Sequence, residues 1–390
     1  MTKWPEAPIG SIAKFVGGGT PKRDKGEYYG GSIPWVTPKD MKSWRISDSQ
    51  VKLTESGLQN SPAKLVPAGS VLVVVRSGIL KHTVPVAIAS VPVALNQDMK
   101  ALICSEDILP EYLARFIKER SDQILTWVRA TTADNFPISD LQKLSIPIPP
   151  IEEQQRIVET LRRANELQVK RQQTIGLLDD LTRSIFLDMF GSDNERSRHP
   201  LGSRLNFVTS GGRGWAKYYA PSGSRFIRSL DVRMNEISDR DAVYVKAPDN
   251  AEARRTRVAA GDILLTITGS LIGRVAAVGK QHDGSYISQH VAILRASLDE
   301  LDPHFLAFYL SLPFGGQRQI RQMQYGQTKP GLNFDQIREF SIPDIPIGEQ
   351  RKFVAILQNI QERSLQAQRQ LIRIAELGAS LETYAFHGRL

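Results

Sequence analysis

Residues 66–80 of this chain read VPAGSVLVVVRSGIL, and residues 258–272 read VAAGDILLTITGSLI. Each stretch is followed by a short matching segment, LNQ at 95–97 and ISQ at 287–289, so both pairs lie 192 residues apart. Solenoid repeats have periods of roughly 20–50 residues, which is far shorter. The repeat therefore predicts a duplicated unit with one globular domain in each copy.

A second repeat closes each copy and leads into a helical pattern. Residues 141–154 (LQKLSIPIPPIEEQ) return as residues 337–350 (IREFSIPDIPIGEQ), now 196 residues apart. The prolines disfavour a helix upstream and set the point at which a helix begins. We therefore expect one long helix after each copy.

A seam of mostly apolar side chains recurs along both expected helices in steps of four and three residues, with a weaker middle at Gln168 and Arg171 and at Ser364 and Ala367. In the first helix these seam positions are Ile157, Leu161, Ala164, Gln168, Arg171, Ile175, Leu178, Thr182, Ile185 and Met189. In the second helix they are Phe353, Leu357, Ile360, Ser364, Ala367, Leu371, Ile374, Gly378, Leu381 and Ala385. Such a spacing is typical of a coiled coil. We predict an antiparallel pair, which relates the copies by a pseudo-two-fold axis. The alternative is two helices packed within one ordinary domain.

The globular part of each copy mixes strands and helices. Residues 71–75 and 263–267 are short apolar runs after a glycine, which predicts buried strands. Residues 110–118 and 303–312 begin with proline and carry helical apolar spacing. Because the two element types do not alternate strictly, we predict an α+β fold. The expected limits are 1–150 for the first globular domain, 151–190 for the central helix, 199–346 for the second domain and 347–390 for the last helix.

The composition indicates two or three ordinary globular domains. The chain has 390 residues, of which 41% are hydrophobic and 23% charged. It lacks an apolar run of membrane-spanning length, and residues 1–8 lack the apolar core of a secretion signal. Cys104 is the single cysteine, which excludes an intramolecular disulfide and a cysteine-cluster zinc site. We expect a cytoplasmic protein without membrane contact.

The charge is positive and is carried by the globular parts. The net charge is +9, and residues 1–150 and 199–346 each hold 18 Lys and Arg against 14 Asp and Glu. Basic domains favour polyanionic partners such as nucleic acid through counterion release. Many soluble proteins are as basic, so this signal alone decides little.

Catalytic motifs are absent from the sequence. It holds no GxxxxGK[ST] phosphate loop and no Asn-Pro-Pro-Tyr/Phe tetrad. The glycines of residues 15–19 (FVGGG) lack the strand-then-helix context of a cofactor loop, so a turn is the preferred interpretation. The six histidines show no metal-ligand spacing. We therefore expect no catalytic residue, no bound cofactor and no metal site in this chain.

Polar loop residues are the candidate DNA contacts. Gly-rich loops and short side chains can approach phosphates, and Arg can pair bidentately with guanine. In the first copy the candidates are Thr20, Lys22, Arg23, Lys39, Arg76, Ser77, Lys81, His82, Arg129, Thr131 and Thr132. In the second copy they are Lys217, Thr268, Ser270, Arg274, Gln327, Thr328 and Lys329. For each of them, a solvated loop residue is the alternative.

Residues 17–23 (GGGTPKR), followed by residues 29–41 (YGGSIPWVTPKDM), resemble the opening of a type I restriction–modification specificity subunit (HsdS). The repeated SIP…EQ pattern before each long helix resembles the same family. The resemblance covers essentially the whole chain. It departs at residues 209–219 (TSGGRGWAKYY), which stand where the first copy has its GGTP…IPW opening. Contacts in the second copy therefore transfer poorly.

The resemblance implies a host-defence protein that binds double-stranded DNA and is not itself catalytic. Each target-recognition domain would read one half of an asymmetric, bipartite site. The helices would set the spacing and dock two modification subunits, which use S-adenosylmethionine to methylate adenine. Two restriction subunits, motors that use ATP and Mg, can join. The expected docking residues at the helix starts are Gln154, Arg156, Gln350 and Arg351.

Two other functions stay open at this point. One is a DNA methyltransferase whose cofactor site is unrecognised, which S-adenosylmethionine binding by the isolated chain would reveal. The other is a two-domain coiled-coil scaffold that binds proteins only, which an absence of DNA sequence preference would favour.

Overall fold

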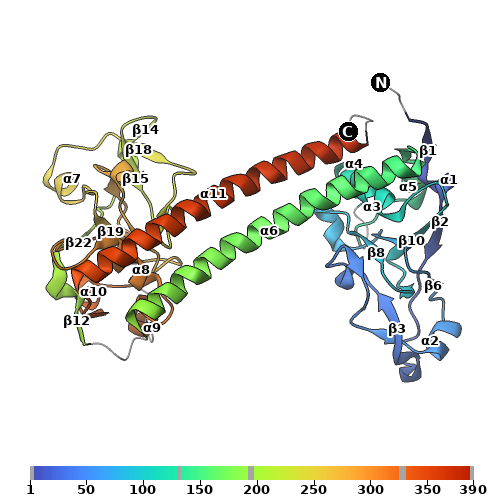
Figure 1. Ribbon diagram of the computed structural model, residues 1–390, viewed down its shortest axis with the longest axis horizontal. Helices are drawn as coiled ribbons and strands as arrows, with labels where there is room; N and C mark the ends of the chain where they lie inside the picture. Colours follow the sequence, from blue (N-terminus) through green and yellow to red (C-terminus); the bar gives the residue numbers. More distant parts are fainter. Residues whose placement is uncertain (1–3, 130–132, 192–196, 325–330, 387–390) are drawn as a thin grey trace. The chain divides into compact units, whose positions relative to one another are not determined.

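The computed structural model describes residues 4–129, 133–191, 197–324 and 331–386, and the chain divides into two compact units. Unit 1 comprises Met1–Thr174 and Ala367–Leu390, and unit 2 comprises Ile175–Gln366. The long helices are α6 (Ile151–Phe190) and α11 (Ile347–Ala385). Each unit thus contains a globular part, the start of one long helix and the end of the other (Figure 1).

Unit 1 is built on a five-stranded sheet in the order β2-β10-β7-β8-β4. Its strands are β2 (Ala13–Gly17), β10 (Met99–Cys104), β7 (Val71–Val74), β8 (Val86–Ala89) and β4 (Arg45–Ile46). A four-stranded sheet follows the order β5 (Lys52–Leu53), β3 (Tyr29–Val36), β9 (Val93–Leu95) and β6 (Leu65–Val66). Strands β1 (Glu6–Pro8) and β11 (Ser145–Pro147) form a separate antiparallel pair.

Unit 2 repeats this plan with a four-stranded sheet in the order β13-β22-β19-β20. Its strands are β13 (Leu205–Ser210), β22 (Val291–Ala296), β19 (Asp262–Thr266) and β20 (Val275–Ala277). The second sheet follows the order β14 (Tyr219–Ala220), β18 (Val243–Val245), β15 (Ser224–Ile227) and β21 (Tyr286–Ile287). Two further pairs are β12 (Arg198–Pro200) with β23 (Ser341–Pro343) and β16 (Val232–Arg233) with β17 (Glu236–Ile237).

The short helices also correspond between the units. Unit 1 has α1 (Ile9–Ile12), α2 (Glu55–Gln59), α3 (Pro110–Glu119), α4 (Ser121–Leu125) and α5 (Ile138–Lys143). Unit 2 has α7 (Ala251–Arg255), α8 (Pro303–Ser311), α9 (Gly316–Gln324) and α10 (Phe334–Arg338). The predicted proline-initiated helices are confirmed as α3 and α8, and the mixed α+β fold is confirmed with them.

The central strands β7 and β19 are largely apolar because both of their faces are buried. Along β7, Val71 and Val73 belong to the core that α3 covers, whereas Leu72 and Val74 belong to a second core on the opposite face. Strand β19 divides its side chains in the same way. A strand buried on both faces reads as a continuous apolar run, which is the pattern that predicted these two strands.

The two long helices use the predicted seam. Every seam position from Ile157 to Met189 and from Phe353 to Ala385 is buried or half-buried, whereas most positions between them are exposed. In unit 1, the start of α6 and the end of α11 share one core; in unit 2, the end of α6 and the start of α11 share another. The antiparallel coiled-coil prediction is therefore confirmed.

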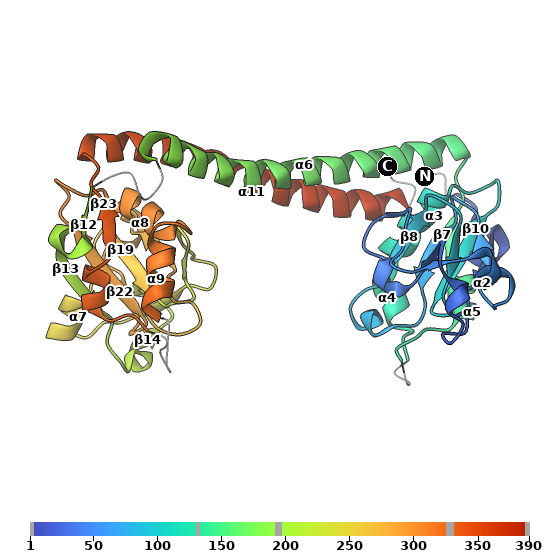
Figure 2. The same ribbon diagram turned by 90° about the horizontal axis from the view of Figure 1, so that it is seen from below.

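Aromatic rings anchor the ends of both helices in the globular cores. In unit 2, the Phe186 ring packs within 5.0–5.8 Å of the rings of Phe190, Phe305 and Phe353. Figure 2 shows α8 in the globular part below this end of the two long helices. In unit 1, Phe386 lies just after α11, and its ring centre is 5.2 Å from that of Tyr112 on α3. The long helices are thus parts of the two cores.

Candidate nucleic-acid interface

The Gly-rich loop that follows β2 is held tightly against unit 1. Gly19 donates its backbone N–H to the carbonyl of Leu95 at 2.8 Å and accepts the indole N–H of Trp35 at 3.0 Å. A Cβ on Gly18 would lie 2.0 Å from the carbonyl oxygen of Asn96, so only glycine allows this approach. The loop therefore presents its polar residues 20–25 from a fixed position.

A cleft of about 740 Å³ opens beside this loop. Five of the predicted contact residues line it, and they come from three separate segments of the sequence: Thr20, Arg23, Lys39, Arg76 and Ser77. The structure thus brings together polar groups that the sequence places up to 57 positions apart. Convergent polar groups in a cleft are the usual form of a binding site.

The cleft also contains polar residues that the sequence reasoning missed. Asn96, Gln97 and Asp98 line it directly after β9. Gln97 contacts the Thr20 hydroxyl through its side-chain oxygen, and Asp98 accepts a 2.6 Å hydrogen bond from the Nε of Arg76. The LNQ repeat was a signal for this position, because it marks the end of a strand that both copies share.

The other candidates of unit 1 lie outside the lining of the cleft. Lys22 is exposed on the same loop, and His82 is exposed after the 3-10 turn Gly78–Lys81. The ammonium of Lys81 lies 4.0 Å from Asp134. Arg129 pairs through its backbone with Asn135, at 2.8 Å from its N–H to that carbonyl. Thr131 and Thr132 lie outside the described residues.

Unit 2 builds the same backbone arrangement with different side chains. A Cβ on Gly211 would lie 2.1 Å from the carbonyl of Ile287, as at Gly18 in unit 1. Thr268 pairs with Gly331 where Arg76 pairs with Asn135. The Thr268 hydroxyl contacts His290 Nδ1, and Gln289 Nε2 lies 3.1 Å from His290 Nε2.

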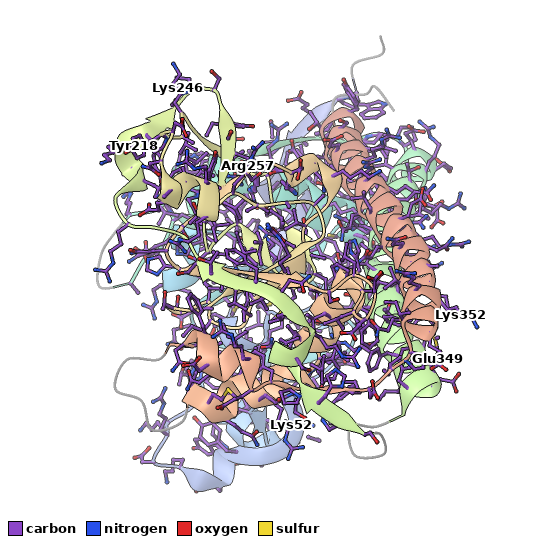
Figure 3. All side chains as sticks on the ribbon, turned by 90° about the vertical axis from the view of Figure 1, so that its left-hand side faces the viewer. Lys52, Tyr218, Lys246, Arg257, Glu349 and Lys352 are labelled. Carbon is purple, nitrogen blue, oxygen red and sulfur yellow. The ribbon has the colours of Figure 1, made fainter. Side chains whose placement is uncertain are left out.

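Three further candidates of unit 2 lie within the described residues. The ammonium of Lys217 lies over the Tyr218 ring, 5.0 Å from its centre. The backbone carbonyl of Tyr218 accepts the backbone N–H of Lys246 at 2.9 Å, and the two labelled residues lie near each other in Figure 3. Ser270 is exposed and Arg274 is half-buried in the turn after β19. Gln327, Thr328 and Lys329 lie outside the described residues.

Comparison with known proteins decides the family. A family model described as "Type I restriction modification DNA specificity domain" matches residues 1–176 and 232–374. The chain belongs to this family. The family resemblance seen in the sequence is thereby confirmed.

Relatives of this specificity chain match over different lengths. The specificity subunit of type I restriction enzyme EcoR124I/EcoR124II from Escherichia coli is 43% identical over 162 residues, which is 41% of this chain and 40% of that protein. The MjaIX specificity subunit of Methanocaldococcus jannaschii is 29% identical over 192 residues, 48% of this chain and 44% of that one. The matches thus span less than half of either relative.

Solved structures match this specificity chain along its whole length. The S subunit of a type I restriction–modification system from M. genitalium aligns with a TM-score of 0.61 at 16% identity, covering 98% of this chain and 96% of that one. A chain from work described as "complex assembly and conformational transition of the type I R-M system" gives 0.62 at 18% identity, with 100% and 99% covered. These matches show a shared fold.

Two of the four expected docking residues of the specificity chain are inward-facing. Gln154 is 0% exposed: it accepts the N–H of Leu109 at 2.9 Å and donates to the carbonyls of Asp107 and Pro149 at 2.8 and 2.9 Å. Gln350 is 2% exposed and makes the corresponding bonds at Asp302, Glu300 and Ile345. These amides are fully used within the chain, so we do not extend the docking proposal to them.

The two expected docking arginines are exposed beside these glutamines. Arg156 pairs with Glu153 at 2.6 Å, and Arg351 donates to the carbonyl of Leu298 at 3.1 Å. They remain available as surface contacts.

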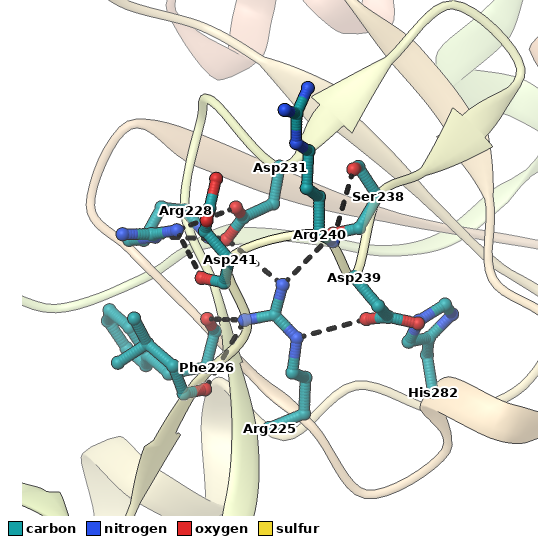
Figure 4. Close-up of polar contacts among 10 residues, drawn as sticks. Arg225, Phe226, Arg228, Asp231, Ser238, Asp239, Arg240, Asp241 and His282 are labelled. Atoms are coloured by element: carbon teal, nitrogen blue, oxygen red, sulfur yellow. Dashed lines mark hydrogen bonds and ion pairs between the residues drawn. The ribbon is translucent and has the colours of Figure 1, made fainter. Parts of the chain in front are cut away.

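A buried charge network braces the loop between β15 and β18 of the specificity chain. Arg225 Nε donates to Asp239 at 3.1 Å, and its Nη2 lies 3.2 Å from Asp231, which is 2% exposed (Figure 4). His282 Nε2 lies 3.0 Å from the other oxygen of Asp239. Because the charges satisfy one another, this network positions the loop and offers little to a ligand.

The described residues give no sign of metal or thiol chemistry. They contain no cluster of His, Cys, Asp and Glu that could hold a metal ion. Burial raises the pKa of the Cys104 thiol to about 12, which keeps it protonated and unreactive. No helix within the described ranges is long and apolar enough to cross a membrane.

Proposed function

We propose that the chain is the DNA-reading subunit of a type I restriction–modification complex, in which each unit reads one half of an asymmetric, bipartite site. The observation that carries this proposal is the pair of matched loop and strand ends, identical in backbone plan and unlike in polar side chains. Two domains that share one fold and recognise different DNA sequences need a common backbone arrangement with different polar side chains on it.

The charges divide the expected contacts into two kinds. Exposed cations such as Lys22 and Lys39 suit phosphates, which position the protein without reading sequence. Side chains in the cleft, such as Gln97, suit base edges in the major groove. We keep Thr131, Thr132, Gln327, Thr328 and Lys329 in the proposal as loop contacts of the same kind.

The helices support a second part of the proposal, the docking of two modification subunits. Val169 and Leu365 occupy matched positions 196 residues apart, as do Leu181 and Leu377. All four are 46–57% exposed, and each unit carries one member of each pair. Exposed apolar side chains at matched places are suited to two equivalent partners. Methylation would then be carried out by these subunits, with S-adenosylmethionine, and restriction subunits with ATP and Mg would join them.

Charge substitutions within one unit test the docking. We expect Val169→Glu with Leu377→Glu to remove one of two bound modification subunits, because a carboxylate in an apolar interface loses its hydration. The matched double variant, Leu365→Glu with Leu181→Glu, should remove the other. Native mass spectrometry of the co-expressed complex counts the subunits, and Lys170→Glu controls for the added charge. A double variant that retains both subunits contradicts the proposal.

Methylation mapping tests the reading function. The chain is co-expressed with the modification subunit of its own system, and modified adenines are located by sequencing host DNA. We expect one asymmetric motif with a fixed gap, and replacement of residues 1–150 should change only one half of it. An assembled complex that yields no motif would favour a protein scaffold instead.

A further inference from the structure

A carboxylate holds the guanidinium that unit 1 presents at the end of β7. Arg76 lies two residues after the end of the strand; its backbone N–H donates to the carbonyl of Asp98 at 3.2 Å, and its backbone pairs with that of Asn135. Its Nε donates to Asp98 Oδ1 at 2.6 Å. The side chain is therefore oriented from both ends.

The orienting carboxylate is itself held by a buried amide. Asn96 is 6% exposed and donates from Nδ2 to Asp98 Oδ2 at 2.9 Å, while the N–H of Asp98 donates to the Asn96 side-chain oxygen at 3.1 Å. Asn96 in turn donates its backbone N–H to Val36 at 3.0 Å. The chain of contacts from the core to the guanidinium leaves Arg76 little freedom to reorient.

This arrangement leaves the outer edge of the guanidinium facing the cleft. The two terminal nitrogens of Arg76 have no hydrogen-bond partner among the described residues, although the side chain lines the cleft and is 48% exposed. The pair with Asp98 carries no net charge, so its attraction to a phosphate is weak. A planar fork of two N–H donors still matches O6 and N7 of guanine.

The matched place in unit 2 holds no guanidinium. Ile267 donates its N–H to the carbonyl of His290 at 2.9 Å, as Val75 does to Asp98 at 2.9 Å, so His290 stands where Asp98 does. By the same correspondence, Thr268 stands where Arg76 does. The two units therefore differ in chemistry at one equivalent reading position.

We propose that Arg76 reads a guanine in the half-site of unit 1 and that Asp98 is its positioning residue. Unit 2 reads its half-site at the equivalent position with a hydroxyl and an imidazole instead. The inference rests on the proposed DNA-reading function and adds to it one base and the pair of residues that selects it.

Selection from a pool of duplexes with random sequence tests this assignment. The full chain is used together with its co-expressed modification subunit, and the bound duplexes are sequenced. The half-site of unit 1 is identified by replacing residues 1–150. We expect guanine at one position of that half-site, preferred about 5- to 150-fold over other bases.

Three variants then address the two residues. Arg76→Lys keeps the charge and loses the fork, and Arg76→Ala with Asp98→Ala removes a neutral pair; both should abolish the guanine preference. Asp98→Asn should weaken it, because the guanidinium loses its orientation. In each variant the half-site of unit 2 should be selected as before, which shows that the protein is folded and bound.

The outcomes separate this inference from the proposed function. If the unaltered protein selects no motif, the DNA-reading function itself fails. If it selects a bipartite motif whose unit 1 half lacks guanine, or if the double variant still selects that guanine, only the assignment of Arg76 is overturned.

Discussion

Replacing Gln154 by leucine should loosen the junction between α6 and the globular part of unit 1. The side chain is fully buried and makes three hydrogen bonds, to the N–H of Leu109 and to the carbonyls of Asp107 and Pro149. Leucine is of similar size, so packing is largely kept and the three backbone groups lose their partner. At roughly 0.5–1.5 kcal/mol for each of the three hydrogen bonds, the local cost is about 1.5–4.5 kcal/mol.

Hydrogen exchange measured by mass spectrometry reports this cost where it arises. Opening that becomes easier by about 1.5–4.5 kcal/mol corresponds to exchange faster by roughly 12- to 1,600-fold. We expect this acceleration in residues 107–113 for Gln154→Leu and in residues 300–306 for Gln350→Leu. The exposed neighbour Gln155 provides the control, because its replacement by leucine should change stability by less than about 0.5 kcal/mol.

Two results would refute the reasoning. Equal exchange in Gln154→Leu and Gln155→Leu would mean that the buried amide does not secure the junction. Faster hydrogen exchange in both globular parts of either single variant would mean that the two glutamines do not act locally and independently.

Three further perturbations have definite expected outcomes. Gly18→Ala should destabilise the protein by about 1–3 kcal/mol, because the new Cβ would lie 2.0 Å from a backbone carbonyl oxygen. Gly26→Ala is the control and should not destabilise it, because no atom lies within 4 Å of the new Cβ. Urea unfolding of the two variants compares their stabilities. Burial raises the pKa of Asp239, but hydrogen bonds from Arg225 and His282 outweigh burial and hold that pKa below the ordinary 3.8. The stability that the Asp239 carboxylate contributes is therefore present above pH 3.8 and is lost as the pH falls through the folded-state pKa. Asp239→Asn should therefore flatten the acid limb of the unfolding curve, and an unchanged limb would argue against this role. Inserting four residues after Lys170 and four after Gln366 should lengthen each long helix by about 6 Å. The gap in the methylation motif should then grow by about one to two base pairs. An unchanged gap would contradict the spacing role of the helices.

The features that were predictable from sequence are those set by local periodicity. The seam of α6 and α11 follows from a 3.5-residue spacing, and β7 follows from four consecutive apolar residues. The starts of α3 and α8 follow from Pro110 and Pro303, which fit the first turn of a helix. In each case, neighbouring residues alone carry the information.

The features that sequence reasoning missed depend on contacts between distant segments. Gln154 looked like a surface residue because it stands among charged residues at a helix start, yet Leu109 and Asp107, more than 40 positions away, enclose it. Asp98 carried no signal of its own until the fold placed it against Arg76. The second sheet of each unit was also missed, because all of its strands except β3 have only two to four residues and are too short to show alternation. Strand β3 has eight residues, but two glycines and a proline interrupt its pattern.

The discontinuity of unit 1 has a consequence for biosynthesis. Unit 2 is one continuous stretch, Ile175–Gln366, so all of its core has been translated before the end of α11. The core of unit 1 instead waits for Phe386, whose ring closes over Tyr112 and Phe116, residues made some 270 positions sooner. A chain whose translation stops before Phe386 lacks the ring that packs on Tyr112 and Phe116. Of the two units, unit 1 is therefore the first whose translation begins and the last whose core is completed, because that core needs a residue that follows α11.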